Sequence, residues 1–212
     1  MAPAWLEKHI VRRDATPDPR RSDEQPTLQM HYTVLLARRR IMGVMGDKIP
    51  RYEIKQHAVL GSFAYKCNVT SPVDGGREVA TIGFQSSKVE IVFPQRDREV
   101  TIKAIDGDYE STGGLGCLHW KPTGMVPFGE ASWELRDESN LVMSVEIDGN
   151  QINGVMSLWK EGIDPETVEE LMVVGVSKIE EYKKLMRGSK RFRVQIASSV
   201  PWLAEESRAQ YC

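Results

Sequence analysis

The stretch IDPETVEELMVVGVSKIEEYKKLMRG, Ile163–Gly188, decides the fold because it is the one long, well-delimited helix signal in the sequence. Asp164 is a typical N-cap, and Pro165 suits the first helical position, where its missing N–H would have no helical partner. Acidic residues open the stretch and basic residues close it, as the helix dipole favours, and Gly188 is a typical helix-ending residue. We therefore predict a helix over residues 164–187.

The middle of this helix is apolar on every side, from Leu171 to Val176. Such a segment belongs in a core and not on a surface. It is too short to cross a membrane, which takes about 20 apolar residues. A continuous strand is the rival interpretation of this run, but the capping residues and the order of the charges favour a helix. The second half is amphipathic and charged, so we expect it to emerge into water.

The part of the chain before the helix reads almost entirely as β-strand. Residues 27–159 alternate between apolar and polar positions, and turn-forming residues separate the segments. A spacing of roughly a dozen residues per strand is typical of an antiparallel sandwich or barrel. The predicted strands are Gln29–Ala37, Arg40–Met45, Arg51–Gln56, Phe63–Val69, Glu78–Gln85, Lys88–Phe93, Glu99–Ile105, Leu115–Lys121, Gly129–Arg136, Leu141–Ile147 and Gly154–Lys160.

A helix that is apolar all round has to be enclosed by these strands. The core of a sandwich, about 10 Å thick, has no room for it, whereas a many-stranded barrel does and also removes exposed strand edges. The sequence therefore predicts a mainly β fold, an antiparallel closed β-barrel of about 11–12 strands that encloses the hydrophobic C-terminal helix. We expect a polar tail at 1–27, the barrel and its helix at 28–188, and an extension at 189–212 in which 193–196 is a candidate extra strand.

Composition sets limits on the class of protein. The 212 residues carry a formal net charge of −2, and 41% are hydrophobic, as in a soluble single-domain protein with no general attraction to nucleic acid. Met1–Arg21 lacks the apolar core of a secretory signal. The three cysteines have no metal-ligand spacing and are too few for a disulfide framework. We expect a cytoplasmic protein without a metal or cofactor.

Four segments in the second half of the chain carry a resemblance to a known family. They are HWKPTG (His119–Gly124), ASWELRDESNLVMSVEI (Ala131–Ile147), INGVMSLWKEG (Ile152–Gly162) and ETVEELMVVGVSKIEEYKKL (Glu166–Leu185). In this order of strands and deep helix, the chain resembles the tubby C-terminal-like superfamily. That superfamily includes tubby proteins, phospholipid scramblases, LURP-one-related proteins and smaller relatives, and the smaller relatives are the most similar.

The resemblance covers about residues 28–188 and implies a barrel filled by its C-terminal helix. It also implies a membrane-associated or phosphoinositide-binding protein and not an enzyme. The chain departs from scramblases because it has no cysteine-rich palmitoylation segment and a polar tail follows its helix. The basic residues with which tubby proteins contact lipid have no clear counterparts here.

Two basic clusters are the candidate binding sites. Either could hold a phosphoinositide head group or another anionic membrane lipid through charge-assisted contacts to phosphate. The alternative is that these charges lie on solvated turns and offset the helix dipole. Neither cluster has aromatic residues interleaved along a strand, so nucleic acid is not an expected partner. The candidate residues are Arg38, Arg39, Arg40, Lys183, Lys184, Arg187, Lys190, Arg191 and Arg193.

One pair of residues has the chemistry of a nucleophile and a base. Cys117 and His119 are two apart in a predicted strand, so their side chains share a face. A thiolate–imidazole pair can be nucleophilic, but the sequence reveals no orienting residue or oxyanion site. Ordinary surface residues are therefore the favoured interpretation, and we predict no catalytic residue.

The predicted function is a non-enzymatic binding module at the periphery of a membrane. A first alternative is a protein–protein interaction scaffold, whose loops and tails engage a protein partner. A second is a carrier of a small apolar ligand, or a hydrolase, on a calycin-like barrel. That alternative needs an empty interior, so it competes with the predicted place of the helix.

Overall fold

The structure is a computed structural model that describes residues 25–58, 65–103, 107–126, 128–138 and 140–199, with helix side chains described as far as Met186. Strands fill the chain up to Leu158, and the helix α2 (Pro165–Ser199) follows. The chain divides into two units, Met1–Glu181 and Tyr182–Cys212, with the boundary inside α2. The strands are β1 (Leu28–Leu36), β2 (Arg39–Gly43), β3 (Tyr52–Ala58), β4 (Tyr65–Ser71), β5 (Arg77–Phe84), β6 (Lys88–Phe93), β7 (Arg98–Lys103), β8 (Tyr109–Glu110), β9 (Cys117–Met125), β10 (Ala131–Arg136), β11 (Leu141–Ile147) and β12 (Asn153–Leu158).

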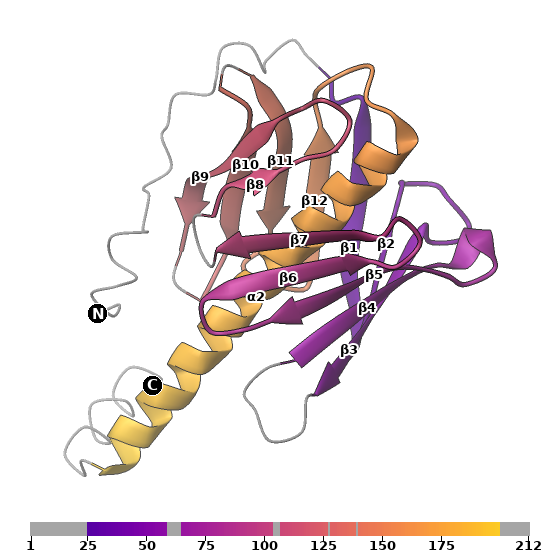
Figure 1. Ribbon diagram of the computed structural model, residues 1–212. Helices are drawn as coiled ribbons and strands as arrows, with labels where there is room; N and C mark the ends of the chain where they lie inside the picture. The colour runs from indigo at the N-terminus through magenta and orange to yellow at the C-terminus, as the bar shows by residue number, and fades with distance from the viewer. Residues whose placement is uncertain (1–24, 59–64, 104–106, 127, 139, 200–212) are drawn as a thin grey trace. The chain divides into compact units, whose positions relative to one another are not determined.

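The strands form one antiparallel, nearly closed barrel (Figure 1). Their order in the 12-stranded sheet is β7-β6-β5-β4-β3-β2-β1-β12-β11-β10-β9-β8, so only the pair β1–β12 joins strands distant in sequence. At the seam between the outermost strands, Arg98 of β7 donates a hydrogen bond to the backbone carbonyl of Glu110 on β8. The prediction of an antiparallel barrel of about 11–12 strands is confirmed at this level.

The strand boundaries agree with the period-two pattern of the sequence. Tyr65, Cys67 and Val69, which the alternation places on one face of β4, are all buried. The prediction misses β8, because a strand of two residues is too short to show any alternation. The predicted tail at 1–27 and extension at 189–212 lie largely outside the described residues.

The start of α2 is where the sequence places it. The backbone N–H of Thr167 donates to the Asp164 carboxylate over 2.9 Å, so Asp164 is the N-cap and Pro165 the first helical residue. The predicted end is wrong, because α2 continues through Gly188 to Ser199. A lone glycine such as Gly188 costs a helix only about 1 kcal/mol, so it does not end α2. The residue that follows Ser199 precedes Pro201, and a residue before proline disfavours the helical conformation.

The continuation of α2 also shows that the candidate extra strand at 193–196 is wrong, because these residues are helical. Phe192, Val194 and Ile196 alternate as a strand would, but an alternation over five residues in a basic segment does not outweigh propagation of an existing helix.

The first half of α2 is buried on all sides. Every residue from Glu169 to Glu181 is buried, which makes this the longest unbroken buried run within residues 1–181 as far as they are described. The apolar part behaves as predicted. The charged part does not, because Lys178, Glu180 and Glu181 are buried instead of emerging into water.

The buried part of α2 packs closely against the neighbouring strands β11 and β12. A Cβ atom at Gly175 would lie 2.7 Å from the sulfur of Met156 on β12 and 3.4 Å from side-chain atoms of Met143 and Val145 on β11. Glycine is therefore the residue that allows the helix to approach these two strands closely. Among the described helical residues, none forms a segment long and apolar enough to cross a membrane.

Because all neighbouring strands are antiparallel, the turns fall into two groups at opposite ends of the barrel. We call the end formed by turns that follow odd-numbered strands the Arg38 end, after the residue between β1 and β2. The other end, where the chain leaves β12 and α2 begins, is the Asp164 end. Glu180 contacts side chains near the Arg38 end, so residues 165–181 run from the Asp164 end toward the Arg38 end.

Candidate functional site

Among the predicted binding residues whose side chains are described, Arg40 is the most deeply buried. It is 1% exposed, and its Nε atom donates to the Glu180 carboxylate over 2.9 Å. The same guanidinium group donates to the side chain of Gln56 and to the carbonyl of Ala37. Its partners all belong to the protein itself, so Arg40 acts here as a link between β2 and α2.

Glu180 also accepts hydrogen bonds from two tyrosines of the barrel. The Tyr32 hydroxyl donates to its carboxylate, and the Tyr65 hydroxyl donates to its backbone carbonyl over 2.7 Å. Burial, and then the nearby Glu180 charge, raise the pKa of Tyr32 well above its ordinary value, so this tyrosine stays protonated. Although burial works against the charge, Glu180 raises the pKa of Arg40, which keeps the guanidinium ionised.

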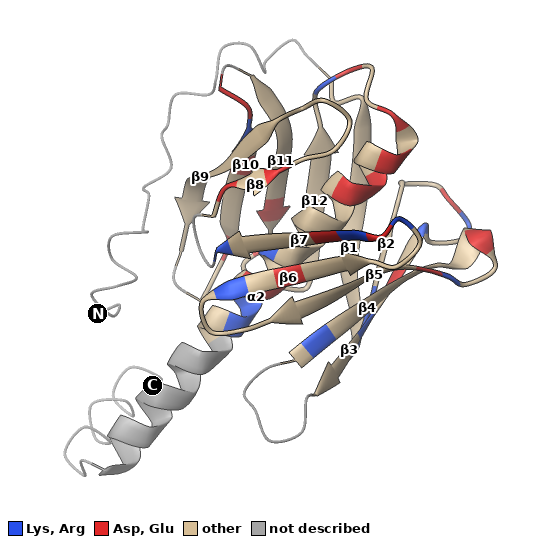
Figure 2. Ribbon diagram, in the orientation of Figure 1, with Lys and Arg blue, Asp and Glu red and all other residues tan. Residues whose placement is uncertain are grey.

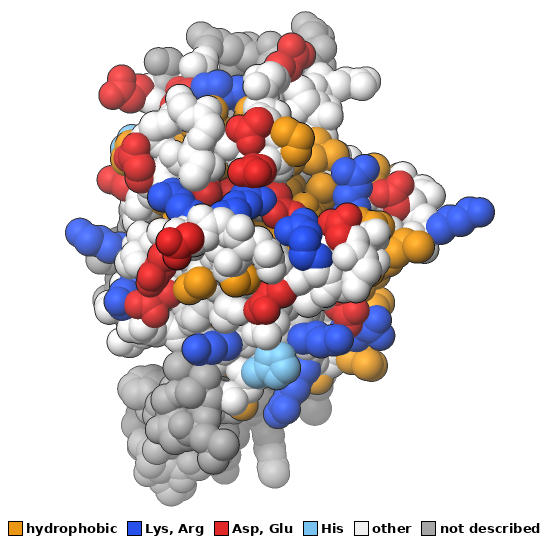
Figure 3. All heavy atoms as spheres, turned by 45° about the vertical axis from the view of Figure 1, so that its right-hand side comes forward, with side chains coloured by type: hydrophobic (Ala, Val, Ile, Leu, Met, Phe, Trp, Pro, Cys, Tyr) orange, Lys and Arg blue, Asp and Glu red, His pale blue; other side chains and the backbone are white. Residues whose placement is uncertain are grey.

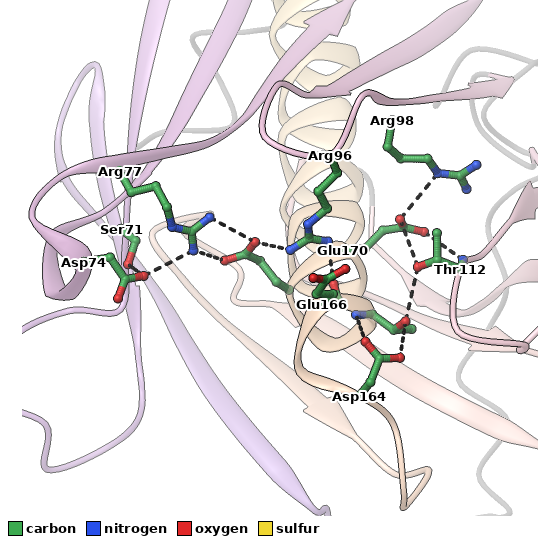
Figure 4. Close-up of polar contacts among 11 residues, drawn as sticks. Ser71, Asp74, Arg77, Arg96, Arg98, Thr112, Asp164, Glu166 and Glu170 are labelled. Atoms are coloured by element: carbon green, nitrogen blue, oxygen red, sulfur yellow. Dashed lines mark hydrogen bonds and ion pairs between the residues drawn. The ribbon is translucent and has the colours of Figure 1, made fainter.

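A second ionic cluster surrounds the start of α2 at the Asp164 end (Figure 4). Arg77 of β5 binds Glu169 through two nitrogens, at 2.7 and 3.4 Å, and Arg96 from the β6–β7 turn binds the same carboxylate. Figure 2 shows the acidic residues on the first turns of α2 and basic residues on the strands beside them. The acidic residues predicted at the helix start therefore form ion pairs with distant arginines, and they also interact favourably with the helix dipole.

Glu170 is the other carboxylate of this cluster and is fully buried. It accepts hydrogen bonds from the Tyr109 hydroxyl at 2.9 Å and from Thr112, and Arg98 of β7 lies 3.5 Å from it. Burial and the Glu170 charge raise the pKa of Tyr109 well above its ordinary value. Since Arg98 and Tyr109 lie on opposite sides of the seam, Glu170 joins the two outermost strands. The carboxylates and arginines of this cluster pair with one another, so the cluster has the features of an ionic network that stabilises the fold.

The other two residues of the predicted Arg38–Arg40 cluster lie on the surface. Arg38 is exposed in the turn, and Arg39 has a side chain that is 49% exposed and pairs with Glu53 at 2.7 Å. The alternation along β2 thus separates Arg39, which points outward, from Arg40, which points inward. The sequence cluster is divided between the surface and the core.

Strand pairing adds basic residues that sequence reasoning missed. Arg39 lies opposite Lys55 of β3, and His57 of β3 lies opposite Lys66 of β4. The backbone of Arg38 accepts a hydrogen bond from the N–H of Gln56, which places Arg38 beside this group. Lys55, His57 and Lys66 are all exposed. The register between the neighbouring strands β2, β3 and β4 creates this group, and the alternation within each strand alone does not reveal it.

Two exposed leucines border the basic residues. Leu35 is 46% exposed and Leu36 is 65% exposed, and Leu36 lies opposite Arg39. Figure 3 shows basic side chains gathered around a histidine on the lower part of the face drawn, with apolar side chains nearby. We call the surface formed by the two leucines and the basic residues of β2–β4 and the preceding turn the Arg38 patch. It consists of Leu35, Leu36, Arg38, Arg39, Lys55, His57 and Lys66.

The second predicted cluster lies in the other unit of the chain. Lys183 is buried and Lys184 is partly exposed. The side chains of Arg187, Lys190, Arg191 and Arg193 lie outside the described residues, so their part in binding stays a prediction.

Cys117 and His119 share the outer face of β9, as predicted, and Asp108 joins them. The Asp108 carboxylate lies 2.8 Å from Nδ1 of His119. An orienting carboxylate is therefore present, although no local sequence pattern indicates it. Desolvation and the charges of Asp108 and Glu110 raise the pKa of the Cys117 thiol. A raised pKa leaves little thiolate at neutral pH, which argues against a nucleophilic role.

Comparison with known proteins identifies no relative: no family model, no curated protein and no solved structure matches the chain. The tubby-like assignment accordingly remains a prediction from the sequence motifs. The fold class stands on the strand order and the helix alone.

Proposed function

We propose that the protein is a non-enzymatic binding module that attaches to anionic membrane surfaces through the Arg38 patch. The observation that carries this proposal is the combination of two exposed leucines with basic residues from three neighbouring strands. Basic residues near a membrane attract anionic lipids by about 1 kcal/mol each, and apolar side chains add affinity by entering the interfacial region. Phosphoinositide head groups are the preferred ligands, because several cations converge on a small area.

The charge balance of the patch supports this proposal. Glu53 pairs with Arg39 at 2.7 Å and lies 3.5 Å from Lys55, and the charge of Lys66 acts on Glu90 of β6. Among the described residues, neither Arg38 nor Lys66 forms an ion pair. These two side chains are therefore available to a phosphate, and we leave the buried Arg40 and Lys183 out of the proposed surface.

We further propose that residues 169–181 of α2 fill the interior of the barrel, in the manner of the tubby-like fold. The burial of every residue in this run, and its contacts with β1, β2, β4, β5, β11 and β12, support this placement. A barrel filled by its own chain has little space for an apolar ligand, so the carrier and hydrolase alternatives are disfavoured. The work of the protein then takes place on its outer surface, at the cytoplasmic face of a membrane.

Co-sedimentation with vesicles tests the proposed surface. Full-length protein is mixed with phosphatidylcholine vesicles, with or without a phosphoinositide. We expect binding only to the anionic vesicles. Replacing Arg38 and Lys66 by glutamate should weaken that binding at least about 30-fold, because two contacts of about 1 kcal/mol are lost and repulsion replaces them.

A matched control reverses two exposed lysines outside the patch, Lys48→Glu with Lys121→Glu. Both double variants change the formal charge by the same amount, so the control should retain most of its affinity. Equal loss in the two variants would contradict a localised site. If no anionic vesicle binds the wild-type protein, the lipid proposal fails and the protein-interaction scaffold becomes the better account.

A further inference from the structure

The outer face of the short β8–β9 ladder brings together three side chains with different metal-binding atoms. Glu110 pairs with Cys117 and Tyr109 with Leu118, so the next residue of each strand places Asp108 opposite His119. Tyr109 and Leu118 point inward and are buried, whereas Asp108, Cys117 and His119 are exposed. Asp108, Cys117 and His119 therefore lie at neighbouring positions on the outer face of this ladder.

The geometry of this group suits a metal ion. One sulfur, one imidazole nitrogen and one carboxylate oxygen all lie within 4.8 Å of one another. In a tetrahedral zinc site with ordinary bond lengths, neighbouring ligand atoms are about 3.3–3.7 Å apart. The Asp108 oxygen and the His119 nitrogen, now 2.8 Å apart, would separate slightly to reach this spacing. Exposed side chains make such adjustments by rotating about their own bonds.

We propose that Asp108, Cys117 and His119 bind a Zn²⁺ ion on the outer surface of the barrel. Thiolate, imidazole and carboxylate are the three ligand types that zinc uses in proteins, and a coordinating zinc ion itself deprotonates the thiol that binds it. Three protein ligands leave the fourth tetrahedral position to water or to a group from another molecule. This site is independent of the Arg38 patch, since the two share no residue.

Other acidic groups of the described chain are poorer candidates. Glu169 and Glu170 are held by Arg77, Arg96 and Arg98, whose positive charges oppose a cation there. By contrast, the described residues place no arginine or lysine in an ion pair with Asp108, whose one partner there is His119.

Cobalt substitution tests the proposal directly. Co²⁺ is titrated into the full-length, reduced protein, and binding through Cys117 should produce a thiolate-to-cobalt charge-transfer absorption. Zn²⁺ should then remove that absorption, because it binds the same site more tightly. Cys117→Ser should abolish the absorption. Asp108→Asn and His119→Ala should each weaken metal binding at least about tenfold, since even outer-shell substitutions cost zinc sites 10–100-fold.

Cys212→Ser is the matched control, because it removes a different thiol and should leave the absorption and the affinity unchanged. Circular dichroism should show that all variants are folded, as expected for exposed positions. The proposal is overturned if the wild-type protein gives no charge-transfer absorption with Co²⁺. It is equally overturned if that absorption survives Cys117→Ser.

Discussion

At the residue scale, three consecutive arginines have different roles. Arg38 and Arg39 are on the surface, whereas Arg40 is buried against Glu180. A buried ion pair whose geometry is complete is not a large net source of stability, but loss of one partner leaves the other charge unpaired in the core. The neighbouring arginines therefore differ sharply in what their removal should cost.

We predict that Arg40→Ala lowers the free energy of unfolding by about 3–5 kcal/mol, the usual cost of breaking a buried pair. Arg39→Ala removes a surface ion pair with Glu53 and should cost only about 0–1 kcal/mol. Urea denaturation followed by circular dichroism measures both values. Similar losses in the two variants would show that Arg40 is not the core residue described above.

The division of these arginines also shows what a sequence can predict about the site. Alternation along β2 is enough to place Arg39 and Arg40 on opposite faces, but not to say which face is inside. Arg40 faces inward because it pairs with Glu180, which is 140 residues from it in the sequence. Lys55 and Lys66 entered the patch through strand register, and Asp108 reached His119 in the same way. These are pairings of consecutive strands, but the exact register that brings the side chains together is not visible in the sequence of either strand.

At the element scale, period and capping predicted most of the structure. The alternating segments became strands, and Asp164–Pro165 marked the helix start. Period and capping did not predict two features of the structure. β8 is too short to have a period, and the helix passes Gly188 because a single glycine is a weak stop signal. The charged half of the helix was expected in water, but arginine and tyrosine side chains from distant strands accommodate its carboxylates in the core.

Packing of α2 against β12 leads to a prediction about two strand glycines. A Cβ atom at Gly154 of β12 would lie 2.7 Å from the Glu146 carbonyl and 3.1 Å from Ile179 of the helix. Gly154→Ala should therefore lower the free energy of unfolding by about 1–3 kcal/mol, as overpacking does.

Gly83 of β5 is the matched control. There a Cβ atom would be 3.8 Å from its nearest neighbour, an ordinary contact. Gly83→Ala should leave stability unchanged or raise it by up to about 1 kcal/mol, because alanine restricts the unfolded chain. Urea denaturation of the two variants distinguishes the positions. If Gly154→Ala proves as stable as Gly83→Ala, the helix does not pack against β12 as closely as described.

At the scale of the whole molecule, a nearly closed barrel is combined with a helix whose residues 169–181 are all buried. Ionic contacts tie α2 to β2 through Arg40, to β5 through Arg77 and to β7 through Arg98. Strand and helix should consequently form one cooperative unit over residues 28–181. If α2 fills the interior as proposed, binding is left to the exterior, where the Arg38 patch and the Asp108–Cys117–His119 group share no residue.

Native-state hydrogen exchange of the backbone amides tests whether the helix fills the barrel. If residues 169–181 fill the barrel, their amides should exchange only through global unfolding, with the same free energy as the amides of β1, β2 and β12. The account would be contradicted if the helix amides exchanged at a clearly lower free energy while those strands stayed protected, because the helix could then leave a barrel that remains folded.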